Sequence, residues 1–92
     1  MEDNEFSTPT EQRLAEIWAE VLRLDKVKRD QDFFEIGGDS LLATTVVLKA
    51  CRVWDVKFTV RVLLAAPVLA ELAERIDELV ARSGRRPERE TT

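Results

Sequence analysis

Apolar residues recur at helical spacing in three stretches of this 92-residue chain, and this periodicity constrains its fold more than any other feature. In the first stretch, residues 9–22, they are Leu14, Ile17, Trp18, Val21 and Leu22. The spacing i, i+3, i+4 places them on one face of a helix. Thr8 and Glu11 have capping-box spacing, and Pro9 falls where a missing N–H costs nothing. We therefore expect a helix that begins near Pro9 and exposes Glu11, like its other acidic residues, to solvent.

A second helical pattern covers residues 40–54 and separates into two faces. The side expected to face the core carries Ala43, Val46, Val47, Ala50 and Trp54. The opposite side carries Leu41, Thr44, Thr45, Leu48 and Arg52. Two leucines on this outward side favour a partner-binding surface made of Leu41, Thr44, Thr45 and Leu48, while an ordinary helix surface explains the pattern equally well.

A third helical pattern covers residues 68–82, after Pro67 has ended the preceding segment. Its apolar positions are Leu69, Leu72, Ala73, Ile76, Leu79 and Val80. Gly84 is the expected stop signal. Before Pro67, residues 59–65 are expected to form a short helix with Val60, Leu63 and Leu64 directed inward.

Residues 23–39 keep neither a helical nor an alternating period, so we expect a long loop between the first and second helices. The residues expected to anchor this loop are Leu24, Val27, Phe33, Phe34 and Ile36. Because no stretch alternates like a strand, the expected fold class is all-α, a small bundle of three main helices plus one short helix. The domain would span residues 8–82, between a flexible tail at 1–7 and a disordered charged tail at 83–92.

Composition and charge exclude several classes of function. A net charge of −4 argues against nonspecific binding to nucleic acid. The longest apolar run, residues 62–66, is too short to span a membrane, and the acidic N-terminal stretch lacks a secretory signal, so a cytoplasmic protein is expected. We also expect a monomer. Cys51 has neither a second cysteine nor any histidine to complete a disulfide or a metal site, so no metal is expected.

Ser40 follows two glycines and an aspartate in the stretch GGDSL, and three roles fit such a serine. Asp39 or Ser40 would cap the second helix. Residues 38–41 also spell the signature of the GDSL esterases, but the chain has no histidine to act as the base, so we interpret this four-residue match as a coincidence. An accessible hydroxyl at a helix N-terminus also suits attachment of a phosphate-linked group, although the carboxylate of Asp39 opposes an anion there.

The stretches LAEIWAEVL, DFFEIGGDSLLATTVVLKA and LLAAPVLAELAERI together resemble the peptidyl carrier proteins, or thiolation domains, of nonribosomal peptide synthetases. The resemblance covers about residues 10–80, with FFEIGGDSL as its most specific part, and implies an acyl-carrier-like fold. Carriers of fatty-acid synthesis usually bear several acidic residues along the second helix, whereas Lys49 and Arg52 are the charged residues here, which favours the peptidyl branch. Met1 and the polar ends favour a free-standing carrier, although an excised segment would look alike.

The resemblance implies that Ser40, in a motif with Gly38 and Asp39, receives 4'-phosphopantetheine from coenzyme A through a separate Mg²⁺-dependent phosphopantetheinyl transferase. The thiol of that arm would carry an aminoacyl or peptidyl group as a thioester. An adenylation enzyme would load it, and condensation or tailoring enzymes of nonribosomal peptide or antibiotic biosynthesis would act on it. The carrier itself would perform no catalysis. The alternative is a non-catalytic helical interaction module in which Ser40 is only a helix cap.

Two positions depart from the pattern of this family. Val68 stands where the family usually has Thr or Ser before the last helix, so a side-chain cap is expected to be missing there. Leu64 replaces a common Phe, which changes packing rather than chemistry.

Overall fold

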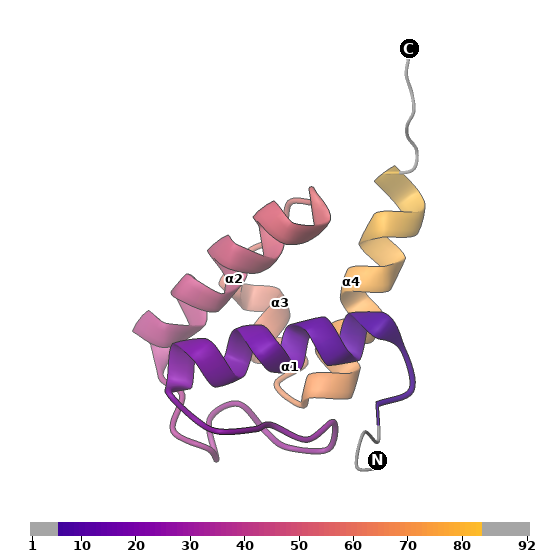
Figure 1. The fold of residues 1–92 in the computed structure, drawn as a ribbon. Helices are drawn as coiled ribbons and strands as arrows, with labels where there is room; N and C mark the ends of the chain where they lie inside the picture. The colour runs from indigo at the N-terminus through magenta and orange to yellow at the C-terminus, as the bar shows by residue number, and fades with distance from the viewer. Residues whose placement is uncertain (1–5, 84–92) are drawn as a thin grey trace.

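The computed structural model describes residues 6–83, which contain four helices (Figure 1). They are α1 Pro9–Leu22, α2 Ser40–Trp54, α3 Val60–Ala65 and α4 Leu69–Ser83. The described residues form no strand, and only an isolated bridge joins Asp32 to Val68. The expected all-α class is confirmed, with three main helices, one short helix and a long loop between α1 and α2. Within residues 6–83, none of the helices combines the length and the hydrophobicity that a membrane span requires.

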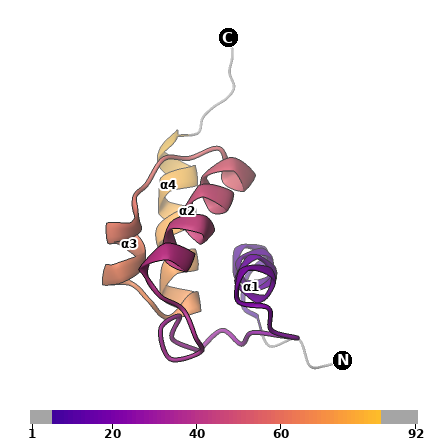
Figure 2. The same ribbon diagram turned by 90° about the vertical axis from the view of Figure 1, so that its left-hand side faces the viewer.

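The four helices enclose one hydrophobic core. Helix α1 lies across α2 and α4, and α3 packs against the same two helices on the side away from α1 (Figure 2). The largest side chains with essentially no exposed surface are Leu14, Trp18, Phe33, Val46, Leu63, Leu69, Leu72 and Ile76. Phe33 belongs to the loop before α2, and its ring meets the Trp18 ring edge-on at 5.1 Å between centroids. The loop is therefore part of the core.

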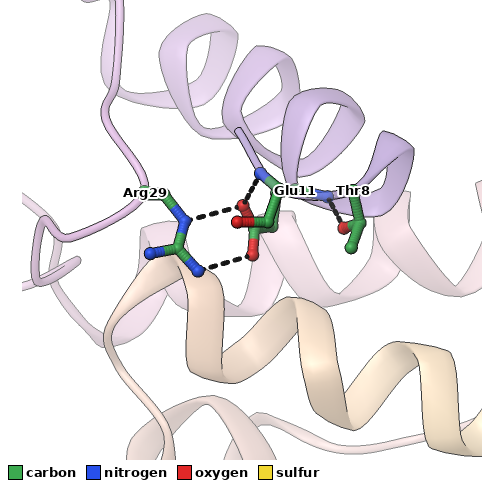
Figure 3. Close-up of polar contacts among 4 residues, drawn as sticks. Thr8, Glu11 and Arg29 are labelled. Carbon is green, nitrogen blue, oxygen red and sulfur yellow. Dashed lines mark hydrogen bonds and ion pairs between the residues drawn. The ribbon is translucent and has the colours of Figure 1, made fainter. Parts of the chain in front are cut away.

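The start of α1 follows the sequence prediction except for the side chain of Glu11. The Thr8 hydroxyl accepts the Glu11 N–H at 3.1 Å, and Pro9 is the first helical residue. The expectation that Glu11 lies on the solvent face is wrong, because this residue is 4% exposed. Its carboxylate accepts the N–H of Ser7 and is also bonded by Arg29 (Figure 3). A partner in the following loop is what allows a charged group to be buried at this position.

Four apolar side chains are more exposed than predicted. Leu64 is 51% exposed, because Leu63 faces the core and the next residue of a helix points about 100° further round. Val80 is 38% exposed and lies in the last turn of α4. In the loop, Leu24 and Phe34 are each 37% exposed, whereas Val27 and Phe33 are buried and anchor the loop as predicted.

The loop before α2 also supplies the bonds that the N-terminus of α4 needs. Val68 has no polar side chain to cap this helix, as noted from the sequence. Backbone carbonyls take its place: Gln31 accepts the Leu69 N–H at 3.1 Å, and Arg29 accepts the Ala70 N–H at 3.0 Å. The first N–H groups of α4 are thus satisfied by backbone of the loop rather than by a side chain.

The ends of the chain are only partly described. Phe6 packs against the core and the Ser7 N–H is bonded to Glu11, and α4 continues to Ser83. Residues 1–5 and 84–92 lie outside the described part, and with them most of both expected tails and the expected stop signal at Gly84. The domain boundaries therefore stay a prediction.

Candidate functional site

The segment that leads into α2 begins with a compact turn built by Asp32. The Oδ1 atom of Asp32 accepts the N–H of Phe34 at 2.8 Å and the N–H of Glu35 at 3.3 Å. The carbonyl of Asp32 accepts the N–H of Ile36 at 3.2 Å. Aspartate favours such local bonds to the backbone that follows it. The turn reverses the chain and directs it toward the first residue of α2.

The two glycines of the motif are required for different structural reasons. Gly37 has φ +111°, a backbone conformation that side-chain-bearing residues rarely adopt. Gly38 is required for space, because a Cβ atom there would lie 2.6 Å from the Phe33 carbonyl oxygen and closer still to the Phe33 ring. The Gly38 N–H donates to that same carbonyl at 2.9 Å. The pair of glycines therefore lets the chain press against a buried phenylalanine just before Ser40.

Asp39, and not Ser40, caps α2. The Asp39 side chain accepts the Leu42 N–H at 2.8 Å, and its carbonyl accepts the Ala43 N–H at 2.8 Å. Ser40 is the first residue of the helix and is exposed. Among the described residues, none hydrogen-bonds to its hydroxyl. The choice between Asp39 and Ser40 as the cap is thereby decided, and the Ser40 hydroxyl is open to solvent.

The residues predicted to bind partners lie on the outer face of α2, close in sequence to Ser40. Leu41 is 76% exposed and Leu48 is 62% exposed. Thr44 is exposed and Thr45 is half-buried, and their hydroxyls donate to carbonyls one turn earlier at 3.0 and 3.3 Å. Because the hydroxyls are bonded within the helix, this face presents mainly methyl groups.

Sequence reasoning missed one exposed leucine on the neighbouring helix α3. Leu64, predicted to be buried, lies exposed on α3, which packs against α2 (Figure 2). A six-residue helix with adjacent leucines gives no periodic signal to decide which of the two faces the core.

The loop that ends at Ser40 is held to α1 by a bidentate ion pair between Glu11 and Arg29 (Figure 3). The hydrogen bonds from Arg29 lower the pKa of the Glu11 carboxyl, against the opposing effect of its burial, and the Ser7 N–H lowers it further. The same bonds raise the pKa of Arg29. Both groups are therefore charged at neutral pH, and the pair fixes the position of the loop relative to α1.

The other chemistry-bearing groups of the described chain have structural surroundings. No group of three or more His, Cys, Asp or Glu residues within residues 6–83 is arranged to hold a metal ion. Cys51 is half-buried, and its thiol lies 3.5 Å from the Phe58 carbonyl oxygen, which fits a packing residue. Trp54 is half-buried as expected for the inner side of α2.

The surroundings of Ser40 fit covalent attachment of a phosphate-linked arm. The hydroxyl is exposed and unbonded within the described chain, while the turn that carries it is fixed to the core through Phe33. The capping carboxylate of Asp39 is directed at the Leu42 N–H. An attached group would thus leave every bond of the turn and of the cap in place.

Comparison with known proteins agrees with these features. The family described as "Phosphopantetheine attachment site" matches residues 12–76. One linear gramicidin synthase of Brevibacillus parabrevis is 40% identical over 78 residues, which cover 85% of this chain. The chain spans only 2% of the length of that synthase. Its similarity is therefore to one small domain of a much larger protein.

Solved carrier structures match over nearly their whole length. A nonribosomal PCP domain is 41% identical, with a TM-score of 0.68, and the match covers 76% of this chain and 90% of that one. A chain from the complex of the phosphopantetheine transferase Sfp with coenzyme A and a peptidyl carrier protein is 33% identical, with a TM-score of 0.76. That match covers 79% of this chain and 95% of the other. The chain belongs to the phosphopantetheine-attachment family, as a carrier domain of the peptidyl type found in nonribosomal peptide synthetases.

Proposed function

We propose that Ser40 is the attachment point of the 4'-phosphopantetheine arm and that this protein presents aminoacyl or peptidyl groups on that arm. The observation that carries the proposal is the exposed Ser40 hydroxyl, which is free of capping because Asp39 performs that role. The alternative, in which Ser40 is only a helix cap, loses its main support for the same reason. Family membership supplies the chemical identity of the arm.

In the proposed transfer, the Ser40 Oγ attacks the phosphorus that bears the pantetheine group of coenzyme A. The Oγ–P bond forms as the P–O bond of the diphosphate breaks, adenosine 3',5'-bisphosphate leaves, and the hydroxyl proton passes to a base of the transferase. Gly38 allows the tight turn before Ser40, and Asp39 holds the first turn of α2, so the hydroxyl stays at the surface. Mg²⁺ and the acid–base groups belong to the transferase in this proposal.

When bound, the arm supplies a thiol that holds the carried group as a thioester. The chain itself contributes an anchor and a recognition surface, without catalytic activity of its own. Tethering of this kind raises the effective concentration of the carried group at each partner enzyme. The proposed partners are a phosphopantetheinyl transferase, an adenylation enzyme, and condensation or tailoring enzymes. Because coenzyme A is a cytoplasmic metabolite, the proposed location is the cytoplasm, where the protein would act as a monomer.

The recognition surface in this proposal is the outer face of α2 formed by Leu41, Thr44, Thr45 and Leu48. Its apolar character and its position beside Ser40 support this assignment. A partner that must release the carrier after each reaction is better served by a few exposed leucines than by a large interface.

The test is the intact mass of the purified protein before and after incubation with coenzyme A, Mg²⁺ and a broad-specificity phosphopantetheinyl transferase. The wild-type protein should gain one phosphopantetheinyl group, and Ser40→Ala should gain none. Ser7→Ala is the matched control, because it removes another serine hydroxyl and should be loaded like the wild type. A wild-type protein that stays unmodified with several transferases, and holds no group beforehand, would favour the helical interaction module instead.

A further inference from the structure

Phe33 connects the turn that carries Ser40 to the segment before α4 through its backbone. Its N–H donates to the carbonyl of Pro67, between α3 and α4, at 2.8 Å. Its own carbonyl accepts the N–H of Gly38 at 2.9 Å. The first bond ties Phe33 to the segment before α4, and the second ties it to the turn before α2, so the turn is fixed relative to the start of α4.

The ring of Phe33 is confined on several sides. It has no exposed surface, and it meets the rings of Trp18 and Phe34 edge-on, at 5.1 and 5.3 Å between centroids. The backbone of Gly38 presses against the ring so closely that a Cβ atom there has no room. In a core packed this tightly, a change in the shape of the ring must move either the aromatic neighbours or the glycine.

A shift of Gly38 is passed directly to the serine. Gly38 is two residues before Ser40, so the chain between them spans at most about 7 Å when fully extended. The residue between them, Asp39, is committed to the cap of α2 by its bond to the Leu42 N–H. The short, hydrogen-bonded chain between Gly38 and Ser40 therefore cannot absorb a displacement of Gly38, and the Ser40 hydroxyl moves with it.

We propose that Phe33 is a positioning residue for the group transfer at Ser40, and this rests on the proposed function of that serine. Phe33 does not touch the reacting atoms. It sets the position of Gly38 through a backbone bond and a ring contact, and through Gly38 the placement of the Ser40 hydroxyl. In-line attack on phosphorus depends on such placement, and a misplacement of about 1 Å costs about a hundredfold in rate in unfavourable cases.

The experiment measures kcat and KM of the full-length protein as the acceptor substrate of a broad-specificity phosphopantetheinyl transferase, with coenzyme A and Mg²⁺. The test variant is Phe33→Leu, which keeps an apolar side chain but removes the flat ring against Gly38. The controls are Ile76→Val and Ile76→Ala, at a fully buried position of α4. One is expected to lose less stability than Phe33→Leu and the other more, as measured by urea unfolding. Hydrogen exchange of the Gly38 amide is followed by NMR in every variant.

A positioning role predicts that Phe33→Leu lowers kcat by about tenfold, with KM within about twofold of wild type because Leu41 and Leu48 still present the α2 face. The Gly38 amide should also exchange faster. An Ile76 variant of equal stability should keep both kcat and the protection of Gly38. Gly38→Ala supplies the second variant, since it displaces the turn without removing any core group, and it should show the same fall in kcat.

Two results would overturn the proposal in distinguishable ways. If Phe33→Leu and Gly38→Ala are folded and transfer proceeds with the kcat of the Ile76 controls, Phe33 is only a core residue. If the wild-type protein itself gains no group, the assignment of Ser40 fails, and the role of Phe33 falls with it.

Discussion

The carboxylate of Glu11 and the guanidinium of Arg29 are joined by two parallel hydrogen bonds, of 2.9 Å from Nε and 3.0 Å from Nη2 (Figure 3). Glu11 lies in the first turn of α1, whereas Arg29 lies in the loop and its carbonyl accepts the Ala70 N–H of α4. The pair thus links α1 to a segment that also completes the N-terminus of α4. We expect it to stabilise the loop that leads to Ser40.

Replacing Glu11 by Gln should destabilise the fold. The amide cannot accept all the bonds that the carboxylate accepts from Ser7 and Arg29, and its NH₂ group would face other donors. We expect the free energy of unfolding to fall by about 1 kcal/mol, a value kept low because one partner of the pair is partly exposed. Urea unfolding at neutral pH measures it. The control is Glu16→Gln, since Glu16 is an exposed residue of the same helix paired with Arg13. Equal stability of the two variants would contradict the prediction.

The stability that Glu11 provides should depend on pH in a defined direction. Its pKa in the folded protein is held below the usual value of 4.5, chiefly by the hydrogen bonds from Arg29. A carboxyl with a depressed folded pKa stabilises the fold above its unfolded pKa and loses this contribution as the pH falls through the folded pKa. The difference in unfolding free energy between wild type and Glu11→Gln should therefore be complete at neutral pH and shrink below about 4.5. Urea unfolding over this range checks it, and a difference that grows on acidification would refute it.

Substitutions at Asp39 and Ser40 should show that Asp39 stabilises α2, whereas the Ser40 hydroxyl contributes little to the stability of the fold. Asp39→Ala removes the cap of α2 and should lower the free energy of unfolding by about 1 kcal/mol. Ser40→Ala removes a hydroxyl that is bonded to no described residue, and alanine suits the first turn of a helix, so stability should change by less than about 0.5 kcal/mol. Thermal and urea unfolding of both variants provide the measurement. A larger loss of stability in Ser40→Ala than in Asp39→Ala would mean that Ser40 is the cap.

The outer face of α2 should matter for partner enzymes and little for folding. Leu48→Ala removes a side chain that is 62% exposed, so the free energy of unfolding should change by less than about 0.5 kcal/mol. The kcat/KM for loading by a phosphopantetheinyl transferase should fall by about tenfold, as expected when an apolar anchor is lost from an interface. Val53→Ala is the matched control, since Val53 is 41% exposed on another side of α2. If both variants lower kcat/KM to a similar extent, Leu48 does not belong to the recognition surface.

Much of the fold follows from the sequence because its main helices carry long periodic patterns. The apolar pattern of α2 and the GGDS stretch before it predicted the observed bounds, Ser40–Trp54. The Thr8 cap was likewise readable from local spacing. The exposure of Leu64 could not be predicted, because the six residues of α3 are too few for a periodic pattern to identify the buried face.

The parts that sequence reasoning missed depend on contacts between residues far apart in the chain. The burial of Glu11 requires Arg29, eighteen residues away in a loop without periodicity. The bonds of Gln31 and Arg29 to the start of α4 are made by backbone carbonyls, which leave no trace in side-chain identity. At the site itself, the motif indicated Ser40 and its two glycines, while the contact of Gly38 with Phe33 emerged only from the packing.

The most direct test of the central claim is fragmentation mass spectrometry of peptides from the protein after loading with coenzyme A and a transferase. We predict a single phosphopantetheinyl group, located on Ser40 in the peptide that contains Gly38 and Asp39. A group on any other residue, or a fully unmodified Ser40 peptide from a protein that has gained mass, would contradict it.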